Sequence, residues 1–121
     1  MKRDPRPYLH DVAEAAARLG DMIASKTLDD YVGDILLRSA VERQLIVIGE
    51  ALYQLRSYFP EVAKRIPNSH RFITFRHVLV HSYNQVEPDV AWGLMETGLD
   101  KLIKGTASVM AGFKPGRPKK R

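Results

Sequence analysis

Apolar residues recur every three to four positions through most of the chain, and this spacing is the strongest constraint on its fold. Prolines and short polar runs separate the segments that carry it, and segments with the alternating pattern of strands are nearly missing. The pattern therefore predicts an all-α protein. A chain of 121 residues suits one domain, and we expect a four- to five-helix antiparallel bundle.

Proline, glycine and capping residues predict where the helices begin and end. Thr27 followed by Asp30 resembles a capping box, Gly33 is expected to bend or divide a long segment, and Pro60 to end it. The expected helices cover about 7–25, 28–58, 60–65, 69–83 and 88–112. Their expected core residues are Val12, Ala16, Leu19, Ile23, Ile35, Leu36, Leu45, Ile48, Leu52, Leu55, Phe59, Val90, Leu94, Leu99, Leu102, Ile103, Val109 and Met110.

The net charge of +5 comes from the last eight residues, KPGRPKKR, which carry five basic side chains and no acid. The 14 basic residues before them balance 14 acidic ones. We therefore divide the chain into a formally neutral helical domain, 1–113, and a basic tail, 114–121, which is expected to be disordered. The tail either contacts nucleic-acid phosphates or simply aids solubility.

The composition narrows the expected compartment and chemistry. No cysteine is present, which excludes disulfides, thiolate catalysis and cysteine zinc sites. The start, MKRDPRPYLHD, contains no apolar region of the kind that a secretory signal needs. Because no run of about 18 apolar residues is present either, we expect a cytoplasmic protein that does not enter a membrane.

An unusual polar cluster lies in the stretch FRHVLVHSYNQVEP, on a predicted helix and the loop after it. At about 100° per residue, one face of this helix carries the large apolar residues Phe72, Phe75, Leu79 and Tyr83. Arg76 falls at the edge of that face, where an unpaired charge is costly. It must extend to water, pair with an acid or line a cleft, and Glu50 is a candidate partner. His77 and His81 share a different face of the same helix.

Arginine and histidine together suit phosphate chemistry. Arg76 offers a planar, permanently charged fork to phosphate oxygens, and a histidine can transfer a proton near neutral pH. Such a pair could cleave RNA without a metal, with arginine stabilising the charge that develops at phosphorus. One chain would use His77 with His81, whereas a two-fold dimer would bring two copies of His81 to one groove. The alternative is a purely structural role for Arg76 and His81.

Other readings of the same residues stay open. His77 and His81 have the spacing of zinc ligands, but a zinc site needs a third ligand, and His10 and His70 are distant in sequence. We therefore expect no metal and no cofactor. His77 either supports the site and contacts RNA or is a surface residue, and Tyr83 could simply pack on the last helix.

Arg76, His81 and Tyr83 match the R-x4-H-x-Y motif of HepT-like HEPN toxins, a family that this chain resembles over about residues 10–104. Three further segments support the resemblance: IGEA at 48–51 resembles a GEA element, YFPE at 58–61 the segment after it, and VAW at 90–92 a VW region with one residue inserted. The chain departs from the family in having His77 where asparagine is frequent, and in lacking a tryptophan before the motif.

The resemblance implies a metal-independent RNase that acts as a homodimer, with Arg76 at the scissile phosphate and His81 in acid–base work. It also implies a partner, a small MNT-type nucleotidyltransferase antitoxin that transfers AMP to Tyr83. The added phosphate and bulk would compete for Arg76 and block RNA. A second hypothesis is a non-catalytic all-α subunit that binds a nucleotidyltransferase and RNA or nucleotide. A third is a DNA-binding accessory protein that works through the tail.

Overall fold

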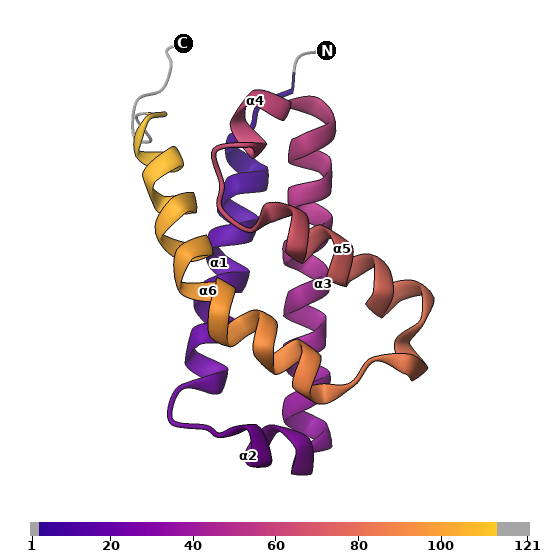
Figure 1. Ribbon diagram of the computed structural model, residues 1–121. Coiled ribbons are helices and arrows are strands. Elements are labelled where there is room, and N and C mark those ends of the chain that lie inside the picture. The colour runs from indigo at the N-terminus through magenta and orange to yellow at the C-terminus, as the bar shows by residue number, and fades with distance from the viewer. Residues whose placement is uncertain (1–2, 114–121) are drawn as a thin grey trace.

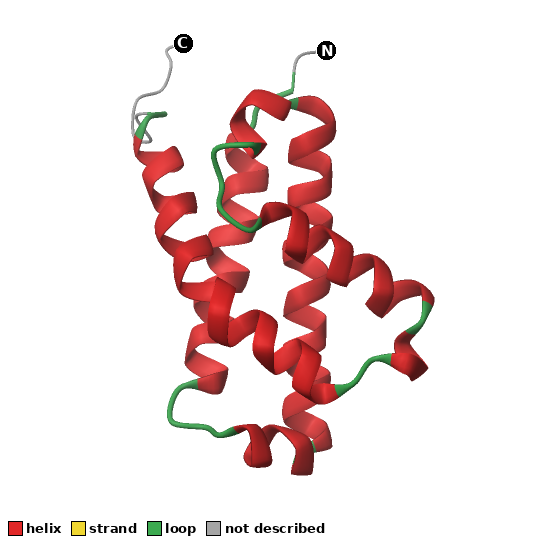
Figure 2. Cartoon of the chain, viewed as in Figure 1, coloured by secondary structure: helices red, strands yellow, loops and turns green. Residues whose placement is uncertain are grey.

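Two long antiparallel helices, α1 (Arg6–Ile23) and α3 (Ile35–Tyr58), form the centre of the computed structural model, which describes residues 3–113 (Figure 1). The described part of the chain is helical with short connections and contains no strand, so the all-α prediction is confirmed (Figure 2). The remaining elements are α2 (Leu28–Gly33), α4 (Pro60–Ala63), α5 (Ser69–His81), the 3-10 helix η1 (Tyr83–Gln85) and α6 (Pro88–Ala111).

The long segment predicted at 28–58 is divided, as the glycine in it suggested. The capping box is present: Thr27 Oγ1 accepts from the Asp30 N–H at 3.1 Å, and Asp30 Oδ2 accepts from the Thr27 N–H at 2.9 Å. These bonds hold the pKa of the Asp30 carboxyl below its usual range. Asp34, directly after Gly33, has an extended backbone, and its carboxylate accepts from the Leu37 N–H at 3.1 Å. Asp34 thereby ends α2 and begins α3.

The core lies where α1, α3, α5 and α6 meet, and most of the residues predicted for it are buried. Three predicted core residues are exposed instead: Ile35, Leu36 and Val90. All three lie in the first turn of their helices, where the apolar stripe continues along the sequence but no neighbouring helix covers it. The largest fully buried apolar side chains are Tyr31, Phe72, Leu9, Leu19, Leu45, Ile48, Leu52, Leu55, Leu102, Val12 and Val41.

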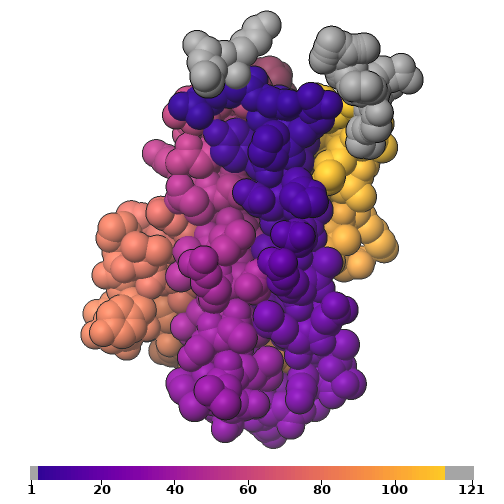
Figure 3. Space-filling model, turned by 180° about the vertical axis from the view of Figure 1, so that it is seen from behind, coloured from indigo at the N-terminus to yellow at the C-terminus, as the bar shows by residue number. Residues whose placement is uncertain are grey.

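Helix α5 crosses α3, and its C-terminal end and η1 project from the side of the bundle (Figures 1 and 3). The helix was expected to reach residue 83 but ends at His81, because Ser82 leaves the helical conformation at φ −144° and ψ 42°. No described helix is both long and apolar enough to cross a membrane. The predicted basic tail, 114–121, lies outside the described residues.

Candidate active site

The close contact between α3 and α5 is built around Gly49 and Arg76. A Cβ atom on residue 49 would overlap Cβ and Cγ of Arg76 and would lie 2.9 Å from the carbonyl oxygen of Phe72. Only glycine therefore lets the backbone of α5 come this close to α3. The stem of Arg76 fills the space over Gly49, which gives a physical reason for the glycine in the IGEA segment.

Glu50 pairs with Arg76, as the sequence suggested. Arg76 Nη2 lies 2.8 Å from Glu50 Oε1, and Gln54 Nε2 donates to Glu50 Oε2 at 2.9 Å. The Arg76 side chain is 26% exposed, so it is screened from bulk water only in part. The buried Arg76 Nε has no hydrogen-bond partner among the described residues. Gln54 thus orients Glu50 and Glu50 balances Arg76. The exposed part of the guanidinium, rather than the buried Nε, remains open to an anion.

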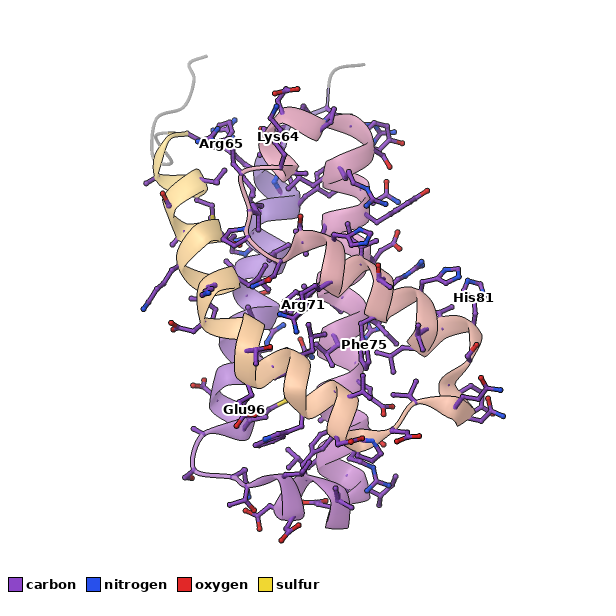
Figure 4. All side chains as sticks on the ribbon, viewed as in Figure 1. Lys64, Arg65, Arg71, Phe75, His81 and Glu96 are labelled. Atoms are coloured by element: carbon purple, nitrogen blue, oxygen red, sulfur yellow. The ribbon has the colours of Figure 1, made fainter. Side chains whose placement is uncertain are left out.

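His77 and His81 lie on successive turns of α5 and face each other. Their ring centroids are 4.4 Å apart and the rings are tilted by 46°. Both side chains are exposed, and His81 lies at the outer end of α5 (Figure 4). The face that the two histidines were predicted to share is therefore present, and it is open to a ligand or a partner.

Arg76 and His81 are not brought together within one chain. Five residues along a helix separate them by about 140° around the axis and about 7.5 Å along it. No hydrogen bond links their side chains in the described structure. A single α5 therefore presents Arg76 toward α3 and His81 at its free end.

Tyr83 lies away from the apolar face on which the sequence placed it. Since α5 ends at His81, Tyr83 begins η1, and its side chain is 76% exposed. Packing of Tyr83 on the last helix, the structural alternative, is contradicted by this exposure. Its hydroxyl makes no side-chain hydrogen bond with another described residue.

Two clefts border α5 on opposite sides. One, of about 260 Å³, lies between α3 and α5 and contains two predicted site residues; it is lined by Tyr53, Arg56, Ile73, Thr74, Arg76 and His77. The other, of about 660 Å³, lies between α5 and α6 and contains none of the predicted site residues. Arg71 and Phe75 border the second cleft (Figure 4), and Arg71 Nη2 donates to Thr97 Oγ1 at 2.9 Å.

Sequence reasoning missed part of the candidate site. Gln54, Tyr53 and Arg56 all follow the IGEA segment within two turns of α3, and this spacing was the available signal. This spacing shows which residues are neighbours on α3, but it does not show which face of α3 is crossed by α5. Among residues 3–113, no three histidine or acidic side chains are grouped so that they could hold a metal ion.

Comparison with known protein families identifies the group to which these features belong. The family model described as "Ribonuclease HepT-like" matches residues 12–109. The "Probable ribonuclease HepT" of Thermococcus cleftensis is 29% identical over 102 residues, which cover 84% of this chain and 92% of that protein. A "Putative RNase" of Methanocaldococcus jannaschii is 25% identical over 103 residues, covering 85% and 94%.

A longer relative shares the same region. The "Gamma-glutamylcyclotransferase and putative RNase" of M. jannaschii is 28% identical over 110 residues, which are 91% of this chain but 49% of that protein. This chain thus spans about half the length of that relative. No solved structure matches. Since the family model covers most of the chain, the protein belongs to the ribonuclease HepT-like family.

Proposed function

We propose that this protein is the RNase toxin of a toxin–antitoxin pair and that it cleaves RNA with Arg76 and His81, without a metal. The family and the names of its relatives support an RNase. The observation that carries the assignment of residues is Arg76, which Gly49 and Glu50 hold at the α3–α5 contact beside a cleft. The guanidinium is partly exposed and borders the same cleft as the exposed side chain of His77, which a purely structural arginine would not require.

In the proposed reaction, a phosphate of RNA takes up the exposed donors of Arg76, while Glu50 holds the guanidinium in place. A neutral histidine accepts the proton of the 2′-hydroxyl, whose oxygen attacks the adjacent phosphorus. The P–O5′ bond breaks, and a protonated histidine gives its proton to the leaving 5′-oxygen. The products are a 2′,3′-cyclic phosphate and a 5′-hydroxyl, and Arg76 stabilises the charge on the phosphorane.

The two proton transfers favour a homodimer. Within one chain, Arg76 and His81 point about 140° apart, so a phosphate on Arg76 is not placed against His81 of the same α5. A two-fold axis beside α5 would bring two copies of His81 to one groove. The projecting end of α5 and η1, with its exposed side chains, gives a second copy access to this face.

We further propose that Tyr83 is the regulated residue. The exposure of its ring leaves the hydroxyl open to an MNT-type nucleotidyltransferase. The tyrosine oxygen would attack the α-phosphate of ATP, form a phosphodiester to AMP and release pyrophosphate. The attached phosphate is two residues from His81, where it would compete for Arg76 and obstruct RNA.

The test of this function is cleavage of RNA by the purified chain in the presence of EDTA. Cleavage is expected, and Arg76→Ala or His81→Ala should reduce it by about 10²-fold or more. His10→Ala, an exposed histidine of α1, is the matched control and should leave the rate unchanged. If His81→Ala cleaves as well as the wild type, the catalytic assignment is wrong.

Two further measurements separate the parts of the proposal. Sedimentation of the wild type tests the homodimer. Mass spectrometry after co-expression with the proposed MNT-type nucleotidyltransferase partner should show steps of one AMP on the peptide that contains Tyr83, and none in Tyr83→Phe. RNA binding without cleavage by the unmodified chain would instead support the alternative, a non-catalytic all-α subunit that binds nucleotide or RNA.

A further inference from the structure

The cleft between α3 and α5 contains two exposed side chains that the proposed reaction leaves unused, Tyr53 and Arg56. They lie three residues apart on α3, and so they are neighbours on one face of that helix. Arg76 and His77 form the opposite wall from α5, and the cleft has a volume of about 260 Å³. Whatever occupies this cleft is therefore in contact with the proposed phosphate site.

The walls of the cleft have the composition of a single-strand binding site. The guanidinium carbon of Arg56 lies 5.9 Å from the centroid of the Tyr53 ring, and Arg56 forms no ion pair with a described acidic residue. Ile73, which is buried, adds an apolar surface, and Thr74 adds a hydroxyl. An aromatic ring with a free cation beside it binds a base by stacking and a phosphate by charge.

A second tyrosine of α3 shows that exposure alone does not produce such a site. Tyr58 is 45% exposed and Tyr53 is 43% exposed. The ring of Tyr58 stacks on the ring of Tyr8, with 6.5 Å between their centroids. The guanidinium carbon of Arg3 lies 3.9 Å from the centroid of the Tyr58 ring. Tyr53 makes no aromatic stack with the described residues, so its ring keeps a face for a ligand.

We propose that this cleft is a subsite for an unpaired nucleobase next to the scissile phosphate, with the base stacked on Tyr53 and a neighbouring phosphate on Arg56. The inference rests on the proposed function and makes its substrate more specific. A base inside a duplex is stacked between its neighbours and does not offer its face to a tyrosine. The substrate is therefore single-stranded RNA, or an unpaired segment of a folded one.

Binding of a fluorescent single-stranded RNA, measured by anisotropy, tests the subsite. The full chain carries His81→Ala so that the probe stays intact. In this background Tyr53→Ala should weaken binding about ten- to a hundred-fold, while Tyr53→Phe, which keeps the ring, should bind nearly as well as the parent. Tyr58→Ala is the matched control and should bind like the parent. Thermal melts establish that each variant is folded.

The phosphate contact has its own readout. Arg56→Ala should make the slope of log K against log salt shallower by about 0.7, the value for one phosphate contact on a single strand. Arg65→Ala, a similarly exposed arginine that lies away from His81 (Figure 4), should leave the slope unchanged. An unchanged slope in Arg56→Ala overturns the phosphate assignment.

The outcomes separate this subsite from the proposed function. If Tyr53→Ala binds single strands like the parent, or if a duplex binds as tightly and depends equally on Tyr53, the subsite is wrong. If the wild type binds RNA through Tyr53 but does not cleave it, the subsite holds and the proposed catalysis fails. A wild type that binds no RNA overturns both.

Discussion

The two halves of α5 differ in what surrounds them. The first half, residues 69–75, is anchored: Phe72 is buried, Arg71 bonds to Thr97 of α6, and Asn68 Nδ2 donates to the Gly98 carbonyl at 3.3 Å. In the second half, residues 76–81, only Leu79 is buried and both histidines are exposed. One helix thus combines a first half that the fold holds with a second half that, beyond the contact of Arg76 with Gly49 and Glu50, is largely exposed. Substitutions in the first half should change stability, and those in the second should change activity.

Phe72→Ala should have the largest effect on stability. The side chain is almost fully buried where α3, α5 and α6 meet, so truncation leaves a cavity and should cost about 3–5 kcal/mol. Urea unfolding measures the loss. Val80→Ala, an exposed apolar residue of the second half, is the control and should stay within about 0.5 kcal/mol of the wild type. Equal losses for the two would show that the halves do not differ.

Gly49→Ala should have the next largest effect, and it should lower both stability and RNA cleavage. The added methyl group meets the Arg76 stem and a backbone carbonyl, neither of which can move freely. We expect a loss of about 1–3 kcal/mol in unfolding free energy, together with reduced cleavage because Arg76 is displaced.

The control for Gly49→Ala is a glycine of α1 with open space around it. Gly20→Ala adds a methyl group with nothing within 4 Å, and it should raise stability by up to about 1 kcal/mol, since alanine is the better helix former. A Gly49→Ala variant that melts and cleaves like the wild type would show that α5 can move away from α3 without consequence for Arg76.

The sequence predicted the anchored half of this molecule better than the exposed half. Apolar spacing identifies buried faces such as that of Phe72, because the hydrophobic effect decides them along the whole helix. It also predicted that Arg76 extends to water, pairs with an acid or lines a cleft. It could not place Tyr53 or Gln54 at the site, because the crossing of α5 over α3 depends on packing around Gly49, which one helix alone does not reveal.

The exposed end of α5 also explains the error at Tyr83. The spacing of Tyr83 from Leu79 continues the apolar face. Serine and asparagine side chains, however, favour turns over continued helix, and here the chain leaves the α-helix at Ser82 and forms η1. No neighbouring element of the described structure packs on this segment to keep it helical. The same lack of cover explains Ile35, Leu36 and Val90 at the first turns of their helices. Periodicity predicts what a helix offers to a core, and only the tertiary structure shows where the core stops.

Glu50→Gln should change stability by less than about 1 kcal/mol, because the ion pair with Arg76 is partly exposed. It should nevertheless lower kcat for RNA cleavage several-fold, since the guanidinium loses the charge that holds it in place. KM should not rise, because the carboxylate no longer competes with RNA phosphate. Glu61→Gln, which removes an exposed pair with Lys64, is the control for charge alone and should not alter either constant. An unchanged kcat in Glu50→Gln would show that Glu50 does not position Arg76 for the reaction and only balances its charge.

His77→Ala should have the smallest effect on stability, within about 0.5 kcal/mol, because the side chain is exposed on the second half of α5. Its effect on the pH profile of kcat/KM separates the two ways of supplying a second proton-transfer group. If two copies of His81 act across a dimer groove, His77→Ala keeps both limbs of the profile and lowers the rate only modestly, through the lost contact with the His81 ring. If His77 is the acid or base, one limb disappears and the rate falls by about 10²-fold or more. We expect both limbs to persist, because Arg76 and His81 point about 140° apart within one chain and the proposed homodimer would supply the second histidine.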